Sequence, residues 1–181
     1  MAELVYVDNS NVFIEGQRVY AVASGKAMNI YDAMNNRILD FDYKIDFGRL
    51  HDFIAGKDTS QIKRCMLFGS RPPPNDSLWK IAERAGFEVI VEDRNVKNKG
   101  KKIDTGIVAA MVKDAYTIAD KANDTITLVA GDSDFVPSVR MLVEDGFKID
   151  VVFWDHAARE LREDCGARFV SLNPILSHLR Y

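Results

Sequence analysis

Short runs of apolar residues recur along the chain and alternate with longer stretches in which the apolar positions follow helical spacing. The short runs are rich in Val, Ile, Leu and Phe, which is typical of strands that are buried on both faces of a sheet. These runs predict strands over residues 4–7, 62–68, 87–91, 125–130, 149–154 and 168–171. The helical spacing predicts helices over residues 47–54, 76–85, 103–122, 135–144 and 157–165.

The order of these elements indicates the fold class. Strands that alternate with helices of about ten residues form βαβ units, which build a parallel sheet with helices on both faces. Gly86 and Gly146 each follow a predicted helix and precede a predicted strand, a position where glycine commonly ends a helix. We therefore expect an α/β protein, a three-layer α/β/α sandwich with a mostly parallel central sheet.

Residues 14–45 do not fit this alternation. A predicted helix near residues 15–23 is followed by Gly25 and by a polar segment with several asparagines. Because the segment is long for a connection, we expect it to hold a helix or a short hairpin of its own, or to act as a flap. We expect residues 1–181 to form a single domain that carries this irregular insertion.

The composition is that of a globular protein, with 47% hydrophobic and 28% charged residues in 181 positions. No apolar run approaches the roughly 20 residues that span a bilayer, and the first residues begin no basic leader, so we expect a cytoplasmic protein without membrane contact. Cys65 and Cys165 lack the spacing of a zinc site or a disulfide framework, and we expect two reduced, buried thiols.

The charge is distributed unevenly. A formal net charge of -3 argues against a protein that coats nucleic acid by bulk charge. Cations nevertheless crowd residues 94–102, which suits local contact with a phosphate chain, although an exposed loop with solvated charges is the alternative. They are Arg94, Lys97, Lys99, Lys101 and Lys102. Arg71, which precedes three prolines after the strand at 62–68, offers a further hydrogen-bond donor to a phosphate at the same edge of the sheet.

Carboxylates follow three of the predicted strands. Asp8 ends the first strand, Asp132 and Asp134 follow the strand at 125–130, and Asp155 follows the strand at 149–154. The carboxyl ends of parallel strands meet at one edge, where ligands bind in such sheets. Clustered carboxylates repel one another, and hard divalent cations such as Mg²⁺ neutralise them. Alternatively, some of these aspartates are protonated or cap helices, as Asp134 or Ser133 could.

Asp104 begins the predicted helix at 103–122 and heads its apolar stripe, so its side chain is expected to point toward the protein. A helix-capping role is the alternative. Its place directly after the basic segment suggests lysines that deliver a phosphate chain to a carboxylate-bound metal. Asp114 and Asp120 fall on other faces of this helix, and we expect both to be solvated.

Three segments, in order, resemble the NYN domain family. They are Val-Asp-Asn-Ser-Asn-Val at 7–12, Lys-Ile-Asp-Thr-Gly-Ile at 102–107 and Leu-Val-Ala-Gly-Asp-Ser-Asp-Phe at 128–135. That family is similar to PIN-domain and flap-nuclease folds. The resemblance runs over roughly residues 4–171, and the three motifs together are specific, whereas Gly-Asp-Ser-Asp-Phe alone would be only suggestive.

The resemblance implies a Rossmann-like, PIN-like sandwich and an endoribonuclease-type hydrolysis of phosphodiester bonds with Mg²⁺ or Mn²⁺. Matched by position, the catalytic and metal-binding residues would be Asp8, Asp104, Asp132 and Asp134. Asn11 would orient a ligand or a substrate phosphate, and Ser133 would support the site. Lys97, Lys99, Lys101 and Lys102 would then hold the backbone of single-stranded RNA by contacts independent of sequence. Asp155 matches no family position, and the insertion departs from the compact members.

Two other functions compete with this reading. A haloacid-dehalogenase-like phosphatase also places an aspartate after its first strand, but it needs a second acid two residues later, where this chain has Ser10. The second competing function is that of a catalytically silent RNA-binding or regulatory module, because the presence of the carboxylates does not prove that the protein cleaves a substrate. His156 lacks a Ser or Cys partner for a nucleophilic triad. A homo-oligomer built on Phe153, Trp154 and residues 176–181 is an alternative to the packing of these residues in the core.

Overall fold

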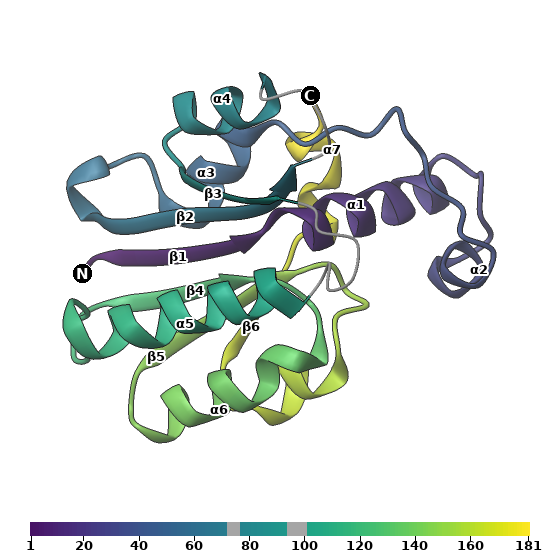
Figure 1. Ribbon diagram of the computed structural model, residues 1–181. Helices are drawn as coiled ribbons and strands as arrows, with labels where there is room; N and C mark the ends of the chain where they lie inside the picture. The colour runs from purple at the N-terminus through teal and green to yellow at the C-terminus, as the bar shows by residue number, and fades with distance from the viewer. Residues whose placement is uncertain (72–76, 94–100) are drawn as a thin grey trace.

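The central element of the protein is a six-stranded sheet, seen in a computed structural model that describes residues 1–71, 77–93 and 101–181 (Figure 1). Its order is β3-β2-β1-β4-β5-β6, and every neighbouring pair is parallel. The strands are β1 (Glu3–Asp8), β2 (Ile62–Arg71), β3 (Glu88–Asp93), β4 (Thr125–Val129), β5 (Lys148–Phe153) and β6 (Arg168–Ser171). The predicted parallel sheet is confirmed.

Helices connect these strands. They are α1 (Asn9–Ala23), α2 (Ile30–Asn35), α3 (Phe47–Ala55), α4 (Ser77–Arg84), α5 (Lys101–Thr117), α6 (Val136–Glu144) and α7 (Leu176–Leu179). Short 3₁₀ turns cover Thr59–Gln61, Ser133–Phe135 and Asn173–Ile175, and a π-helical turn covers Glu160–Asp164. Gly86 and Gly146 have positive φ and follow α4 and α6, as predicted for residues that end helices.

Two predicted helices are shorter than expected. The helix predicted to reach residue 122 ends at Thr117, because Asp120 and Asp124 form a turn in which the Asp124 carboxylate accepts from the Asp120 backbone N–H at 2.8 Å. The segment 157–165 contains only the π-helical turn. The backbone N–H of Ala158 there donates to Gly131 at 2.8 Å, which ties the segment to the loop after β4 instead of to its own helix.

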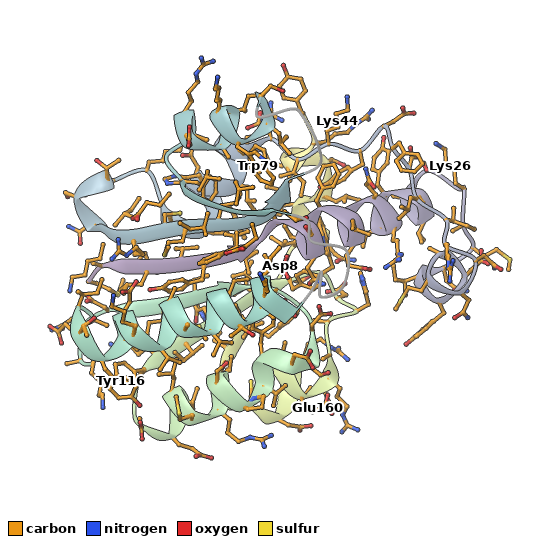
Figure 2. The ribbon with its side chains drawn as sticks, viewed as in Figure 1. Asp8, Lys26, Lys44, Trp79, Tyr116 and Glu160 are labelled. Carbon is orange, nitrogen blue, oxygen red and sulfur yellow. The ribbon has the colours of Figure 1, made fainter. Side chains whose placement is uncertain are left out.

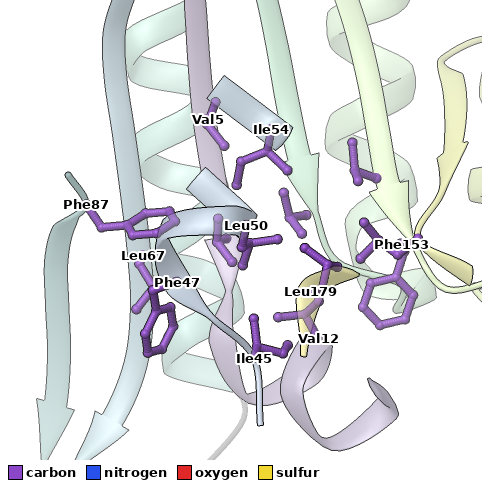
Figure 3. Close-up of a cluster of buried hydrophobic side chains, with 14 of the residues drawn as sticks. Val5, Val12, Ile45, Phe47, Leu50, Ile54, Leu67, Phe87, Phe153 and Leu179 are labelled. Carbon is purple, nitrogen blue, oxygen red and sulfur yellow. The ribbon is translucent and has the colours of Figure 1, made fainter. Parts of the chain in front are cut away.

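Helices cover both faces of the sheet and create two hydrophobic cores, so the predicted three-layer α/β/α sandwich is confirmed. On one face Val5 and Val7 of β1 pack with side chains of α1, α3, α4 and α7, and Figure 3 shows this cluster around Leu50 and Leu179. On the other face Leu4 and Tyr6 pack with α5 and α6. Successive residues of β1 therefore serve opposite cores, because side chains alternate along a strand.

The strand order changes direction beside β1. The chain adds β2 and β3 on one side of β1, and then crosses over to add β4, β5 and β6 on the other side. In open parallel sheets the crevice at such a switch point, at the carboxyl ends of the strands, is where ligands bind. Asp8 ends β1, and the Gly131–Asp132 loop follows β4, so both lie at this crevice.

The insertion predicted at residues 14–45 is partly corrected. Helix α1 begins at Asn9, immediately after β1, because the Asp8 carboxylate accepts from the Asn11 backbone N–H at 3.1 Å and caps the helix. The insertion that remains holds α2, which Asn29 caps. Among the described residues no hairpin forms in it, and only an isolated bridge joins Ile45 to Arg180. Helix α2 lies beyond the far end of α1, away from the sheet (Figure 1).

Asp114 is buried, so the expectation that it is solvated is wrong, whereas Asp120 is exposed as expected. The Asp114 carboxylate accepts from the Tyr6 hydroxyl at 2.8 Å and from Arg64 Nε at 3.0 Å. These two donors come from the strands that α5 covers, and they satisfy a carboxylate that the helical pattern alone assigns to solvent.

Three further expectations concern burial. Cys65 and Cys165 are buried free thiols, as predicted. Phe153 and Trp154 are 2% and 0% exposed, so both belong to the core and neither provides a surface for a second copy. The described part of the chain contains no helix with the length and apolar character needed to cross a membrane.

Candidate active site

A pocket of about 520 Å³ lies at the switch point of the sheet. Three of the four predicted carboxylates, those of Asp8, Asp104 and Asp132, line it together with seven other residues. The complete lining is Asp8, Ser10, Asn11, Ile14, Glu15, Arg18, Ser70, Ile103, Asp104 and Asp132. Asp134 does not line the pocket, but its charge raises the pKa values of Asp104 and Asp132. We call this cavity the acidic pocket.

Asp8 is the most buried of these carboxylates, at 5% exposure, and lies where β1 ends and α1 begins (Figure 2). Burial raises its pKa to about 7, although the hydrogen bond from the Asn11 backbone lowers it. The charges of Asp104 and Asp132 raise it further. With a pKa near 7, the Asp8 carboxyl is partly protonated at neutral pH.

Asn11 joins the first turn of α1 to the loop after β4. Its Oδ1 accepts from the Gly131 backbone N–H at 3.0 Å, and its Nδ2 donates to Asp132 Oδ2, also at 3.0 Å. Asn11 thus positions the Asp132 carboxylate across the switch point. Its amide nitrogen carries a second N–H, which could bind a substrate phosphate. That contact, expected from the sequence, stays a prediction.

Asp132 is more exposed than Asp8. Partial burial raises its pKa, the hydrogen bond from Asn11 lowers it, and the charges of Glu15 and Asp134 raise it again. Its backbone begins the 3₁₀ turn Ser133–Phe135 without a capping hydrogen bond from its side chain. The carboxylate is therefore available to a ligand in the pocket.

Gly131 brings the β4 loop into contact with the core. A Cβ added at this position would lie 2.2 Å from Cδ1 and Cε1 of the Phe153 ring, which is itself buried. We expect Gly131→Ala to lower the free energy of unfolding by about 1–3 kcal/mol, the usual cost of overpacking a core. It should also weaken the site, because the shifted loop carries the N–H that holds Asn11.

Urea denaturation of the parent and the variant measures this loss. Gly106→Ala is the matched control, since a Cβ there would meet only Phe68 atoms, 3.7 and 3.8 Å away. We expect that substitution in α5 to be neutral or slightly stabilising. Equal stability of the Gly131 and Gly106 variants would contradict the close approach of Gly131 to Phe153.

Asp104 lies in the first turn of α5, which begins at Lys101, so it is not the residue that caps this helix. Its partly buried carboxylate has a raised pKa, first because of burial and then because of the charges of Asp132 and Asp134. The positive end of the α5 dipole favours a negative charge here. Asp104 thus reaches the acidic pocket from the helix layer on the other face of the sheet from α1.

Arg18 is a site residue that the sequence analysis missed. It lines the acidic pocket, and its guanidinium forms an ion pair with Glu15, one turn earlier on α1. Its buried Nε has no hydrogen-bond partner. Residues 11, 15 and 18 share one face of a helix, so this spacing would have shown the residue had α1 been predicted to start at Asn9. An arginine that lines such a pocket suits a phosphate group, which guanidinium N–H groups bind.

The other predicted site residues are placed as follows. Ser133 is exposed in the turn after Asp132, and Lys102 is exposed in the first turn of α5. Lys97 and Lys99 lie outside the described residues, as do the side chains of Arg71 and Lys101. Asp155 lies at the same edge of the sheet but lines a different pocket, where it accepts from Ser171 Oγ at 2.5 Å.

The acidic pocket fits a hard divalent cation in its chemistry. Among the described residues, no three or more His, Cys, Asp or Glu side chains form a ready-made metal cluster. Mg²⁺, however, commonly uses only one or two carboxylates and completes its shell with waters and substrate phosphates. The charges of Asp104 and Asp132 raise the pKa of Asp8, and the charge of Asp132 also raises the pKa of Asp104, so a cation would relieve this repulsion.

Comparison with known proteins identifies a family and a similar solved structure. A sequence profile of the NYN domain matches residues 9–173. A crystal structure of a protein of unknown function from Vibrio parahaemolyticus has the same fold, with a TM-score of 0.64 and 17% sequence identity over 94% of this chain and 92% of that one. No curated protein sequence matches the chain.

Proposed function

Because this chain belongs to the NYN domain family, we propose that it is a metal-dependent endoribonuclease that hydrolyses phosphodiester bonds of single-stranded RNA. The observation that carries the proposal is the convergence of Asp8, Asp104 and Asp132, from three separate elements, on one pocket at the switch point. The PIN-like nuclease fold of the family supports the same reaction class.

Each residue of the pocket has a proposed role in this reaction. Asp8, Asp104 and Asp132, with Asp134 close by, would hold Mg²⁺ or Mn²⁺, which activates water and offsets charge on the phosphate. Asn11 positions Asp132. Arg18, which lines the pocket, offers guanidinium N–H groups to a phosphate oxygen of the strand, and Glu15 holds the guanidinium in place.

The overall reaction adds water across one P–O bond. The water oxygen joins phosphorus, the bond to one ribose oxygen breaks, and one water proton ends on that ribose oxygen as a hydroxyl. The other proton passes to the new phosphate monoester or to solvent. No histidine is required as a general base in this scheme, and the described lining of the acidic pocket contains none.

The direct test is cleavage of a labelled single-stranded RNA by the purified protein with Mg²⁺ or Mn²⁺. We expect internal cleavage with either ion, none with chelator, and recovery when the ion is restored. Failure to cleave any single-stranded RNA with either ion, by a folded protein, would contradict the proposal.

We expect single-strand binding to depend on salt because of the basic segment. If three of Lys97, Lys99, Lys101 and Lys102 contact phosphates, the logarithm of the binding constant should fall with the logarithm of salt concentration with a slope of about -2. A titration of fluorescence anisotropy at several salt concentrations measures this slope. Alanine at the first three lysines should leave at most one of these contacts, and hence a slope between about -0.7 and zero.

The matched control replaces three lysines at the amino edge of the sheet, Lys57, Lys121 and Lys148. Lys57 follows α3, Lys121 precedes β4 and Lys148 begins β5. This control has the same net charge as the first triple variant and should keep the parental slope. Equal slopes for the two triple variants would exclude the basic segment as the phosphate contact.

A catalytically silent RNA-binding module is the second candidate. The observation that favours it is that the described carboxylates do not form a cluster of three already placed to hold a metal. Retained RNA binding without any metal-dependent cleavage would support it. The phosphatase alternative would require a phosphorylated Asp8, a residue that is buried and caps α1, with Ser10 in the place of its acid.

A further inference from the structure

A second pocket, of about 620 Å³, lies between the outer half of α1, helix α2 and the segment that follows β5. Its apolar wall includes Val19 and Val22 of α1, with Ile30 and Met34 of α2. Tyr31, on α2, lines it as well and is 73% exposed. We call it the α2 pocket, because the insertion supplies helix α2, whose residues complete its lining.

The two pockets share a wall. Glu15 lines the acidic pocket, His156 lines the α2 pocket, and the Glu15 carboxylate lies 2.7 Å from His156 Nε2. Both side chains are largely buried, at 14% and 12% exposure, so this contact is a partition between the cavities. Arg18, which pairs with the same Glu15, stands on the side of the acidic pocket.

The chemistry of the α2 pocket matches a flat heteroaromatic ring. Its wall is apolar, it carries an exposed aromatic side chain, and polar groups of Asp155, Asn173 and Arg162 stand among the lining residues. RNA-binding proteins use this combination for unpaired bases, which stack on aromatic rings and form hydrogen bonds along their edges. One atom of each group already forms a hydrogen bond within the protein: Asp155 accepts from Ser171 Oγ, Asn173 Oδ1 accepts from the Asp155 backbone N–H, and Arg162 Nε donates to the Ala157 carbonyl. These bonds hold the groups in place, and their other polar atoms, such as Asn173 Nδ2, suit the edge of a base.

We propose that the α2 pocket binds an unpaired nucleobase of the RNA strand whose phosphodiester occupies the acidic pocket, with Tyr31 as the stacking platform. The identity of the ligand rests on the proposed function. The base enters from the same strand because the cavities lie side by side, with Arg18 at the phosphate between them. A base in a double helix must first leave its stack and its partner, which is unfavourable, so the pocket favours single strands.

The test measures the affinity of a labelled single-stranded oligoribonucleotide by fluorescence anisotropy, with Ca²⁺ in place of Mg²⁺ and the strand checked for integrity. The variants are Tyr31→Ala and the control Phe41→Ala. Phe41 belongs to the same insertion and is 72% exposed, but it does not line the pocket. We expect Tyr31→Ala to weaken binding about 5- to 150-fold, the range for one lost base–aromatic stack, and Phe41→Ala to change it less than twofold.

An oligomer of the same length that lacks its bases separates base stacking from backbone contact. The parent should bind it more weakly than RNA, and Tyr31→Ala should then have no further effect. Parental affinity of the Tyr31 variant for intact RNA, or the same loss for Tyr31→Ala and Phe41→Ala, would overturn the base pocket. So would failure of the parent to bind single-stranded RNA.

These outcomes are distinct from those for catalysis. Binding that requires bases and Tyr31, in a protein that cleaves nothing with Mg²⁺ or Mn²⁺, supports the base pocket while the proposed hydrolysis fails. Metal-dependent cleavage in which Tyr31→Ala changes neither affinity nor the positions of the cuts supports the nuclease and overturns the base pocket.

Discussion

Asp132→Asn will reduce metal-dependent RNA cleavage by about 10²- to 10³-fold or more while leaving the fold intact. The substitution removes one negative charge from the acidic pocket and keeps the size of the side chain. Its amide oxygen can still accept the hydrogen bond that Asn11 donates to Asp132 Oδ2 at 3.0 Å. Loss of a single preorganised electrostatic contact to a reacting group has effects of this size on turnover.

The measurement compares single-turnover cleavage rates of parent and variant prepared in the same way. Asp52→Asn is the matched control, an exposed aspartate on α3 that lines a pocket at the amino edge of the sheet. It should cleave at the parental rate. Equal activity of the parent and the Asp132 variant would point to a contaminant or to a different site.

Asp8→Asn will stabilise the metal-free protein at neutral pH. The pKa of Asp8 rises from 3.8 to about 7 in the folded state. Below pH 3.8 the carboxyl is protonated in both states and costs nothing. Between pH 3.8 and pH 7 the carboxyl loses its proton in the unfolded state before it does so in the folded state, so the free energy of unfolding falls as pH rises. Above pH 7 the folded state has lost the full amount, about 4 kcal/mol.

Asparagine at position 8 avoids this cost, because it does not ionise and still caps α1. The stability difference between variant and parent, from urea denaturation with chelator present, should therefore be small at pH 4 and approach about 4 kcal/mol at pH 8. Added Mn²⁺ should raise the melting temperature of the parent more than that of Asp8→Asn, since the ion stabilises the state that binds it. A difference that does not vary with pH would contradict the raised pKa.

The positions of the strands could be predicted from the sequence, whereas their order could not. Buried strands such as β1 and β4 have continuous apolar sequences, which mark them directly. The neighbours of β1, however, depend on the side of β1 to which each connection returns the chain, and no local sequence pattern determines that. The carboxyl-edge aspartates could still be assigned to one site, because every strand of a parallel sheet ends at the same edge.

The residues that were misjudged depend on distant partners. Asp114 is buried because Tyr6 and Arg64 satisfy it from two strands, and neither partner is near it in the sequence. Arg18 was missed because the start of α1 was placed too late. Asp8 is the last residue of β1 and also the N-cap of α1, so no loop separates the two elements. The apolar spacing therefore does not indicate where the strand ends and the helix begins.

The hydrogen bond between Asn11 and Asp132 joins residues 121 positions apart, and this separation has a consequence for biosynthesis. A ribosome extends the chain from its amino end, so β1 and the cap of α1 emerge long before β4 supplies Asp132. Until then the β4-facing edge of β1 has no partner strand. A partly synthesised chain therefore lacks the assembled carboxylates, and the proposed activity would begin only after residues through the β4 loop have left the ribosome.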